Sequence, residues 1–166
     1  MNGAARRGVY AYIKHFALND RETNRVSLPQ TYANEQTIRE IYLRPFEIVV
    51  KDYEPGQSQA VMSSYNYVGT RYSGANPDLL NGVLRGEWGF TGMVLSDWYG
   101  SYGYQQTTDC VLNGNNAMLA IVPQPRAAVE RQDSPAVVSA LRQASKNILY
   151  TVVNSGAYQM QEAAAG

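Results

Sequence analysis

The sequence has 166 residues and is 45% hydrophobic, which is enough for one globular domain. Fourteen Lys and Arg balance fourteen Asp and Glu, so no nucleic acid and no anionic membrane is expected as a partner. A single cysteine, Cys110, and a single histidine, His15, exclude an internal disulfide and argue against a metal centre; no cofactor is expected. Without a membrane-length apolar stretch or a signal-peptide pattern, the expected location is cytoplasmic.

Short β-rich runs alternate with longer helical patterns along the chain, as in a parallel sheet with crossover helices. The first unit begins with a strand over residues 9–16, followed by a polar loop over residues 19–34. That loop is long for a β-α connection, so it is a candidate functional loop. A helix follows over residues 38–53, and Pro45 is expected to kink or interrupt it near the middle.

The second and third strands are separated by a well-marked helix. The second strand is predicted over residues 59–65, and the helix after it begins at Asn76-Pro77, where Asn caps the helix and Pro takes the first helical position. Gly89 ends this helix. The run over residues 91–96 is apolar and β-rich, so it is the predicted third strand, and Asp97 follows it directly.

The fourth unit is the weakest in pattern. It has a helix over about residues 104–112 and a strand over residues 117–122, and a long helix then starts at Ser134-Pro135. That helix carries one apolar stripe: Val137, Val138, Leu141, Ser145, Ile148, Leu149 and Val152. Residues 1–156 are expected to form one partial domain, with residues 157–166 as a frayed tail.

Four β-α units are half of a (β/α)8 barrel, which takes about 250 residues to close. The expected fold class is therefore α/β, a (β/α)4 half of a TIM-type barrel with parallel strands and crossover helices. An open doubly wound sheet is the alternative. Neither a GxGxxG turn nor a GxxxxGK[ST] loop is present to support a nucleotide-binding version of it.

Three of the predicted strands end in pairs of polar or aromatic residues that come directly after apolar runs: Lys14-His15, Tyr65-Asn66 and Asp97-Trp98. In parallel β-α architectures the functional residues lie at this carboxyl edge of the sheet. Taken alone, Asp97 is as well explained as a helix cap or a loop carboxylate, and His15 as an ordinary core or surface histidine. Three such pairs at one edge favour a functional site.

Several longer motifs stand in one order between Val9 and Tyr99: KHFA at 14–17, Asn24-Arg25, REIYLRPF at 39–46, MSSYN at 62–66, LRGEWGF at 84–90 and GMVLSDW at 92–98. In order and spacing they closely resemble β-glucosidases of glycoside hydrolase family 3. The helix over residues 140–150 also resembles family members in which the barrel follows the family's other domain. By this resemblance, the chain is the carboxyl-terminal half of the catalytic barrel.

The resemblance implies a role for five residues. Asp97 would be the nucleophile that forms a covalent glycosyl intermediate, and Lys14 and His15 would bind hydroxyls of the sugar in the first subsite. Tyr65 would flank the nucleophile, and Trp98 would form an aromatic wall beside the sugar. The implied activity is that of a retaining exo-β-glucosidase, which hydrolyses terminal β-D-glucosyl residues of a β-glucoside or oligosaccharide.

The chain departs from the family pattern in several ways, among them the absence of the amino-terminal half-barrel and the residues Asp20 and Arg21, which differ from the amide pair common in the family. A retaining glycosidase needs a second carboxylic acid, which the family usually takes from its other domain. Asn116 stands where related sequences lead us to expect Asp. We therefore expect a truncated form that needs the missing half-barrel and the acid/base domain, and whose partner is either a second copy or the remaining part of the same enzyme. A non-catalytic sugar-binding or assembly module with a half-barrel fold, including a structural half-barrel that dimerises, is the alternative.

Overall fold

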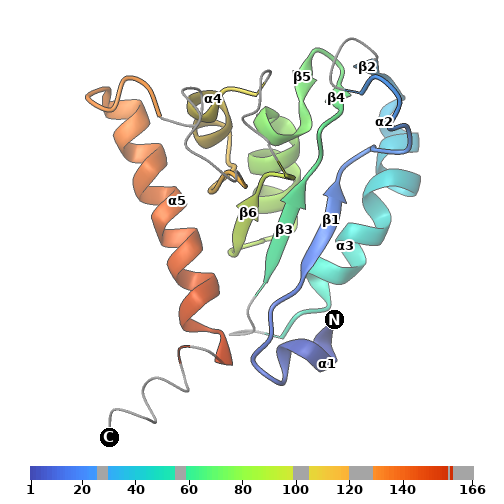
Figure 1. Cartoon of the computed structure of the whole chain (residues 1–166). Helices are drawn as coiled ribbons and strands as arrows, with labels where there is room; N and C mark the ends of the chain where they lie inside the picture. Colours follow the sequence, from blue (N-terminus) through green and yellow to red (C-terminus); the bar gives the residue numbers. More distant parts are fainter. Residues whose placement is uncertain (26–29, 55–58, 99–104, 120–128, 157, 159–166) are drawn as a thin grey trace, which may run out of the picture.

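The computed structural model describes residues 1–25, 30–54, 59–98, 105–119, 129–156 and 158, and Figure 1 shows the arrangement. Its main sheet has three parallel strands in the order β1-β3-β6. Their bounds are Tyr12–Phe16 for β1, Ala60–Ser63 for β3 and Met93–Leu95 for β6. A parallel bridge between Leu95 and Ala117 lies on the free side of β6. The chain is thus an α/β protein with a parallel sheet.

One face of the sheet packs on helices and forms the core. Ile13 pairs with Val61, and Val61 with Val94, so the three side chains occupy one row across the strands. They pack with Leu43 and Leu80 in the main apolar cluster. A half-barrel with helices on its outer side predicts Val61, together with Tyr12 and Met93, on the inner face that no helix covers. For Val61 this prediction is wrong, because alternation along the strand turns its side chain toward the helices.

The opposite face of the sheet carries Tyr12, Ala60 and Met93, which are also paired across the strands. The Tyr12 hydroxyl donates to the Met93 sulfur at 3.8 Å. Burial, with the neighbouring Tyr10, raises the pKa of Tyr12 to about 12. Tyr12 therefore stays a neutral donor on this face.

Pro45 interrupts the first predicted helix, as the sequence indicates. The helix consists of α2 (Glu35–Thr37), a π-helical segment η1 (Ile38–Leu43) and α3 (Arg44–Lys51). The wider turn ends where Arg44-Pro45 begins the regular helix, since proline has no N–H to donate to the preceding turn. The Asn34 side chain caps the start by accepting from the Thr37 N–H at 2.8 Å.

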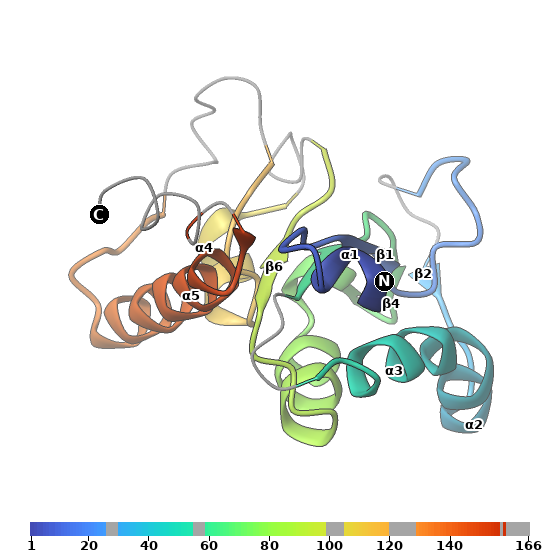
Figure 2. The same cartoon turned by 90° about the horizontal axis from the view of Figure 1, so that it is seen from below.

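The second helix begins one residue later than predicted, after Pro77, and ends before Gly89 as predicted. It is η3 (Asp78–Glu87), also π-helical, and Asn76 Oδ1 accepts from the Asp78 and Leu79 amides at 3.0 and 3.2 Å. Gly89 follows the helix with a φ of +73°, a left-handed conformation that glycine adopts without strain. Figure 2 shows η3 and α3 on the same side of the sheet.

Helix α5 (Pro135–Val153) follows Ser134 as predicted, and it lies beyond β6 together with α4 (Thr107–Leu112). The predicted apolar stripe of α5 is only partly correct. The helix buries Val137, Ala144, Asn147 and Thr151, whereas Ser145, Leu149 and Val152 are exposed. The reason is a hydrogen-bonding contact: the Thr151 hydroxyl accepts from Met93 N and donates to Gln59 O, both at 2.9 Å. This contact turns the polar Thr151 toward the sheet.

A second, smaller sheet adjoins the carboxyl ends of the main strands. It has the order β2-β4-β5, with bounds Gln30–Thr31, Tyr67–Val68 and Arg71–Tyr72. Strands β4 and β5 form an antiparallel hairpin, and the short helix η2 (Ser73–Ala75) follows it. The sequence predicts polar loops here, because two-residue strands leave no periodic signal.

The two ends of the described chain lie side by side at the amino edge of the sheet (Figures 1 and 2). After α1 (Asn2–Ala5), the Gly8 carbonyl accepts from the Gly156 N–H at 2.7 Å. A Cβ on Gly8 would lie 2.5 Å from the Gly156 Cα, so this approach requires glycine. The contact joins the segment before β1 to the end of α5.

Of the predicted fourth strand, 117–122, the structure shows the single parallel bridge at Ala117. Residues 120–122 lie outside the described part of the chain, as do nearly all residues of the predicted tail 157–166. The other predicted strands are each observed but shorter at both ends or at the start. Half-barrel closure and the domain bounds stay predictions. In the ranges described, no helix is long and apolar enough to cross a membrane.

Candidate active site

Asp97 lies directly after β6, at the carboxyl edge of the sheet. Its Oδ1 accepts from the Trp98 backbone N–H at 2.7 Å, and its side chain is only 12% exposed. The preceding residue fixes the backbone here: the Ser96 hydroxyl donates to the Asp97 carbonyl at 2.9 Å and accepts from Leu119 N at 2.8 Å. The carboxylate is therefore held on a rigid strand end with one oxygen already oriented.

His15 reaches the other oxygen of this carboxylate. It lies on β1, and its Nε2 is 3.2 Å from Asp97 Oδ2. Burial lowers the pKa of His15 below its usual value. The Asp97 carboxylate opposes this shift, and the Lys14 and Arg25 charges add to it. A neutral imidazole with its proton on Nε2 then donates to Asp97.

Lys14 precedes His15 on β1 and is exposed. Its ammonium lowers the pKa of His15, so its charge acts on the same site. The peptide bonds Lys14–His15 and Phe16–Ala17 are both cis. Because the side chain is exposed at the strand end, the Lys14 ammonium can serve as a donor at this edge, beside a neutral histidine.

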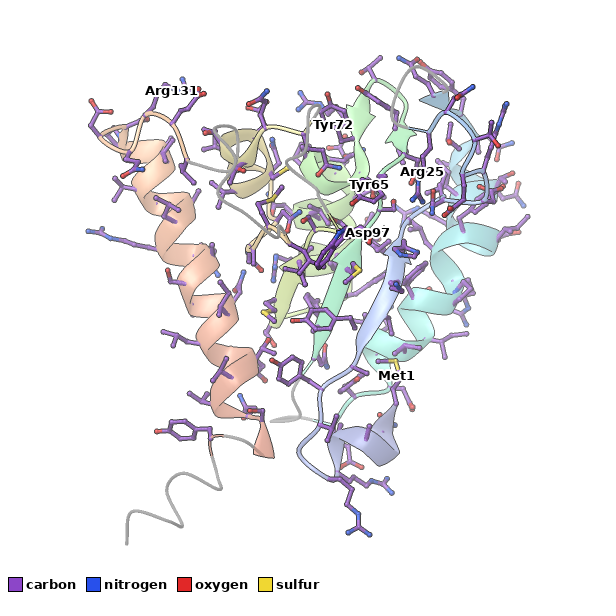
Figure 3. The ribbon with its side chains drawn as sticks, in the orientation of Figure 1. Met1, Arg25, Tyr65, Tyr72, Asp97 and Arg131 are labelled. Carbon is purple, nitrogen blue, oxygen red and sulfur yellow. The ribbon has the colours of Figure 1, made fainter. Side chains whose placement is uncertain are left out.

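Tyr65 follows β3 and contacts a residue that sequence reasoning left without a role. The guanidinium carbon of Arg25 lies over the Tyr65 ring, 4.8 Å from its centroid, a cation–π arrangement. Arg25 also pairs with Glu22, with 2.6 Å between Nη1 and Oε1. Figure 3 shows Arg25, Tyr65 and Asp97 close together above the strand ends. An arginine within the long polar loop 19–34 was the signal that could have identified it.

Trp98 and Asn66 differ from the other predicted residues. Trp98 is 42% exposed, and its backbone N–H is the group that donates to Asp97 Oδ1. Asn66 is buried, and its Nδ2 donates to the carbonyls of Ala17 and Leu18 at 3.0 and 3.1 Å. Asn66 thus holds the turn after β1 in place, which is a structural role.

Buried hydroxyls support the turn that carries His15. The Ser73 hydroxyl donates to the Phe16 carbonyl at 2.5 Å and accepts from Ala17 N at 3.0 Å. The Ser64 hydroxyl donates to the Ala17 carbonyl at 3.1 Å. Because buried backbone groups need partners, these contacts stabilise an irregular turn that no ladder of strand hydrogen bonds could satisfy.

Asn116, the position where Asp is expected, lies at a buried arginine. Its Oδ1 accepts from Arg85 Nη2 and from Val94 N, both at 2.8 Å. Arg85 otherwise donates to the carbonyls of Phe90, Gly92 and Gly114 at 3.1–3.4 Å. Burial lowers the pKa of Arg85 to about 10. The guanidinium is thus surrounded by neutral acceptors, and Asn116 acts in the fold rather than at Asp97.

The site as a whole is a carboxylate with one backbone and one imidazole donor, beside a lysine, an arginine and two aromatic rings. A carboxylate placed this way can attack an electrophilic carbon, and the surrounding donors suit a polyhydroxylated ligand. Among the described residues, no group of three or more His, Cys, Asp or Glu is placed to hold a metal ion.

Comparison with known proteins gives the same family from sequence and structure. The sequence profile of the glycosyl hydrolase family 3 N terminal domain matches residues 1–152. A β-glucosidase of Rhizobium radiobacter is 46% identical over 113 residues, which are 68% of this chain and 13% of that protein. Beta-glucosidase A of Butyrivibrio fibrisolvens is 47% identical over 100 residues, 60% of this chain and 12% of that protein.

A solved structure also covers nearly the whole chain. Beta-glucosidase 3B of Thermotoga neapolitana, determined in complex with glucose, matches with a TM-score of 0.75 and 34% identity, over 95% of this chain and 22% of that one. The chain thus spans a small part of the length of the relatives that it matches. With a family profile over nearly its full length, the chain belongs to the glycosyl hydrolase family 3 N terminal domain family.

Proposed function

We propose that this chain carries the nucleophile and part of the sugar pocket of a retaining exo-β-glucosidase that removes terminal β-D-glucosyl residues. The observation that carries the proposal is the pair of Asp97 and His15, 3.2 Å apart at the carboxyl ends of β6 and β1. The β-glucosidase names of the relatives support the choice of reaction and sugar.

In the proposed mechanism, one Asp97 oxygen attacks the anomeric carbon and forms an acylal bond as the bond to the leaving oxygen breaks. A second carboxylic acid, about 5–5.5 Å away in retaining enzymes, protonates that oxygen, and its conjugate base then takes a proton from the water that releases glucose. We assign the second acid to another part of a longer enzyme. Losing general acid help alone slows the reaction about 10²- to 10⁴-fold, so the chain alone is a weak catalyst.

The other site residues have separate proposed roles. Lys14 donates to sugar hydroxyls, and His15 both donates to Asp97 and bounds the first subsite. Trp98, an exposed residue next to Asp97, forms an aromatic wall. Arg25 fixes the plane of the Tyr65 ring next to the nucleophile. The last role is a positioning one, because Arg25 acts through Tyr65.

We further propose that residues 1–156 are the carboxyl-terminal half of a (β/α)8 barrel, truncated and completed by a partner. Exposed apolar residues occur on the helices at both ends of the sheet: Ile41 and Ile48 after β1, and Leu149 and Val152 on α5. Such side chains favour association, because water-exposed apolar area is costly. The partner is either a second copy or the remaining half of the enzyme.

Glucose binding tests the pocket without requiring catalysis. Calorimetry on the parent should detect glucose binding, and Lys14→Ala should weaken it about tenfold, the effect of losing one charged hydrogen bond. Lys51→Ala is the matched control, because Lys51 is an exposed lysine that pairs with Glu47 on α3. Equal glucose affinity in the parent and Lys14→Ala would contradict the role of Lys14. A parent that binds glucose but releases no dinitrophenolate from a dinitrophenyl β-glucoside, whose leaving group needs no protonation, would instead favour a sugar-binding module.

A further inference from the structure

A cleft separate from the Asp97–His15 pair opens between the β4–β5 hairpin and helix α4. Its volume is about 350 Å³, within the range of small-molecule sites. It is lined by Thr70, Arg71, Tyr72, Ala75, Asp109 and Asn113, and we call it the hairpin cleft. Its walls come from the hairpin, from η2 and from α4, and Figure 1 shows β5 and α4 at the end of the molecule toward which the strands point.

Two opposite charges face the hairpin cleft without neutralising each other. Arg71 and Asp109 both line it, and within the described ranges neither side chain takes part in an ion pair. An anionic ligand would meet the Asp109 carboxylate, and a cationic ligand would meet the Arg71 guanidinium. A neutral ligand that both donates and accepts hydrogen bonds satisfies the two groups together. Neighbouring hydroxyls of a sugar have this property.

The remaining wall suits the apolar face of a sugar ring. Tyr72 packs against Tyr67 with ring centroids 4.4 Å apart, which holds the Tyr72 ring in place. Ala75 lies beside it in the cleft wall. The Asn113 Nδ2 donates to the Asp109 carbonyl at 2.8 Å, which orients the amide and leaves its oxygen as an acceptor. An aromatic face with carboxylate, amide and guanidinium groups around it matches a pyranose, whose faces are apolar and whose rim is polar.

We propose that the hairpin cleft binds a neutral hexose unit of an oligosaccharide, as a second sugar site distinct from Asp97. Figure 3 shows Tyr72 on the same side of the molecule as Tyr65 and Asp97, beyond the strand ends. A longer glucan chain can therefore approach both sites from one side. The inference rests on the proposed function only for the choice of glucose as the sugar unit.

The test compares a single sugar with a chain of four, in an Asp97→Asn background that prevents turnover. Calorimetry and amide NMR are recorded with glucose, cellotetraose and laminaritetraose. At least one tetrasaccharide should bind about tenfold more tightly than glucose and shift the amide resonances of Tyr72, Asp109 and Asn113. Tyr72→Ala and Asp109→Asn should each remove that advantage and leave glucose affinity unchanged.

Tyr32→Ala and Asp133→Asn serve as controls, because they remove an exposed tyrosine and an exposed aspartate outside the cleft. Asp109 is exposed on α4, so Asp109→Asn tests the cleft even if Tyr72→Ala disturbs the hairpin. Tetrasaccharides that bind no better than glucose, or an advantage that survives Asp109→Asn, would overturn the inference. Tetrasaccharide shifts in the cleft without glucose shifts at His15 would refute the proposed function and support the cleft.

Discussion

His15 Nε2 lies 3.2 Å from Asp97 Oδ2, and this contact joins the carboxyl ends of β1 and β6, which β3 separates in the sheet. The contact spans the whole described parallel sheet. Asp97 receives a second hydrogen bond from Trp98 N at 2.7 Å. Both carboxylate oxygens thus have a fixed donor, which is the preorganisation that a nucleophile at a strand end requires.

The lowered pKa of His15 makes folding stability depend on pH. The unfolded chain binds a proton at His15 near pH 6.5, whereas the folded chain binds it only at lower pH. The free energy of unfolding should therefore rise as pH increases toward 6.5, and the contribution linked to His15 should be lost on acidification. His15→Gln keeps a donor for Asp97 and removes the titration, so its stability should rise less between pH 5 and 7. Urea unfolding at several pH values checks this, and because His15 is the only histidine, parallel curves for both proteins would contradict it.

Much of the fold could be predicted because its signals are local. Asn76 and Gly89 mark the ends of η3 by capping and by a positive φ, and Pro45 marks the change from η1 to α3. Long-range contacts decided the rest. The face of α5 that is buried depends on the Thr151 contacts to Met93 in β6 and to Gln59 just before β3, and no periodic pattern in the helix contains that information.

The same distinction applies to the candidate site. The ends of the predicted strands indicate where His15, Tyr65 and Asp97 lie, and the structure brings His15 and Asp97 together. Arg25 was missed as a site residue because its contact with Tyr65 depends on how the polar loop folds back. The hairpin cleft was missed for a similar reason, since β4 and β5 are two-residue strands and Asp109 lies on a different element.

The buried Arg85 predicts a stabilising substitution. Asn116→Asp would place a carboxylate on a guanidinium that otherwise has neutral acceptors, with Asn116 Oδ1 already 2.8 Å from Nη2. The free energy of unfolding should rise by about 1–2 kcal/mol at pH 7, as for a hydrogen bond made charged at both ends. The gain should begin to decline at about pH 4, the usual pKa of an Asp carboxyl, and disappear as pH falls further through the lower pKa that the Arg85 guanidinium gives this carboxyl in the folded chain. Denaturant unfolding measures it, with the exposed Gln132→Glu as a control; a loss of stability at pH 7 would contradict this view of Arg85.

Association should depend on the exposed apolar face of α5. Leu149 is 59% exposed, and Leu149→Glu would put a charge into any interface that covers it. We expect the parent chain to self-associate at micromolar concentration and the variant to do so at least about tenfold more weakly, because buried apolar area is worth roughly 25 cal/mol per Å². Ser139→Glu, at another exposed position of α5, is the control. A stable, cooperatively folding parent monomer in light scattering would argue against an open half-barrel.

Asp97→Asn should abolish any glycosidase activity, but the identity of the nucleophile is tested most directly by trapping the covalent intermediate. A dinitrophenyl β-glucoside with fluorine in place of the 2-hydroxyl has a leaving group that needs no protonation, so the missing acid does not prevent the first step. The fluorine slows hydrolysis of the glycosyl intermediate, so the intermediate accumulates. We expect one sugar per chain, with release of one dinitrophenolate, and peptide mass spectrometry should locate the sugar on Asp97. Asp97→Asn should remain unlabelled. A sugar on any other residue, or a burst unchanged in Asp97→Asn, would contradict the assignment of Asp97 as the nucleophile.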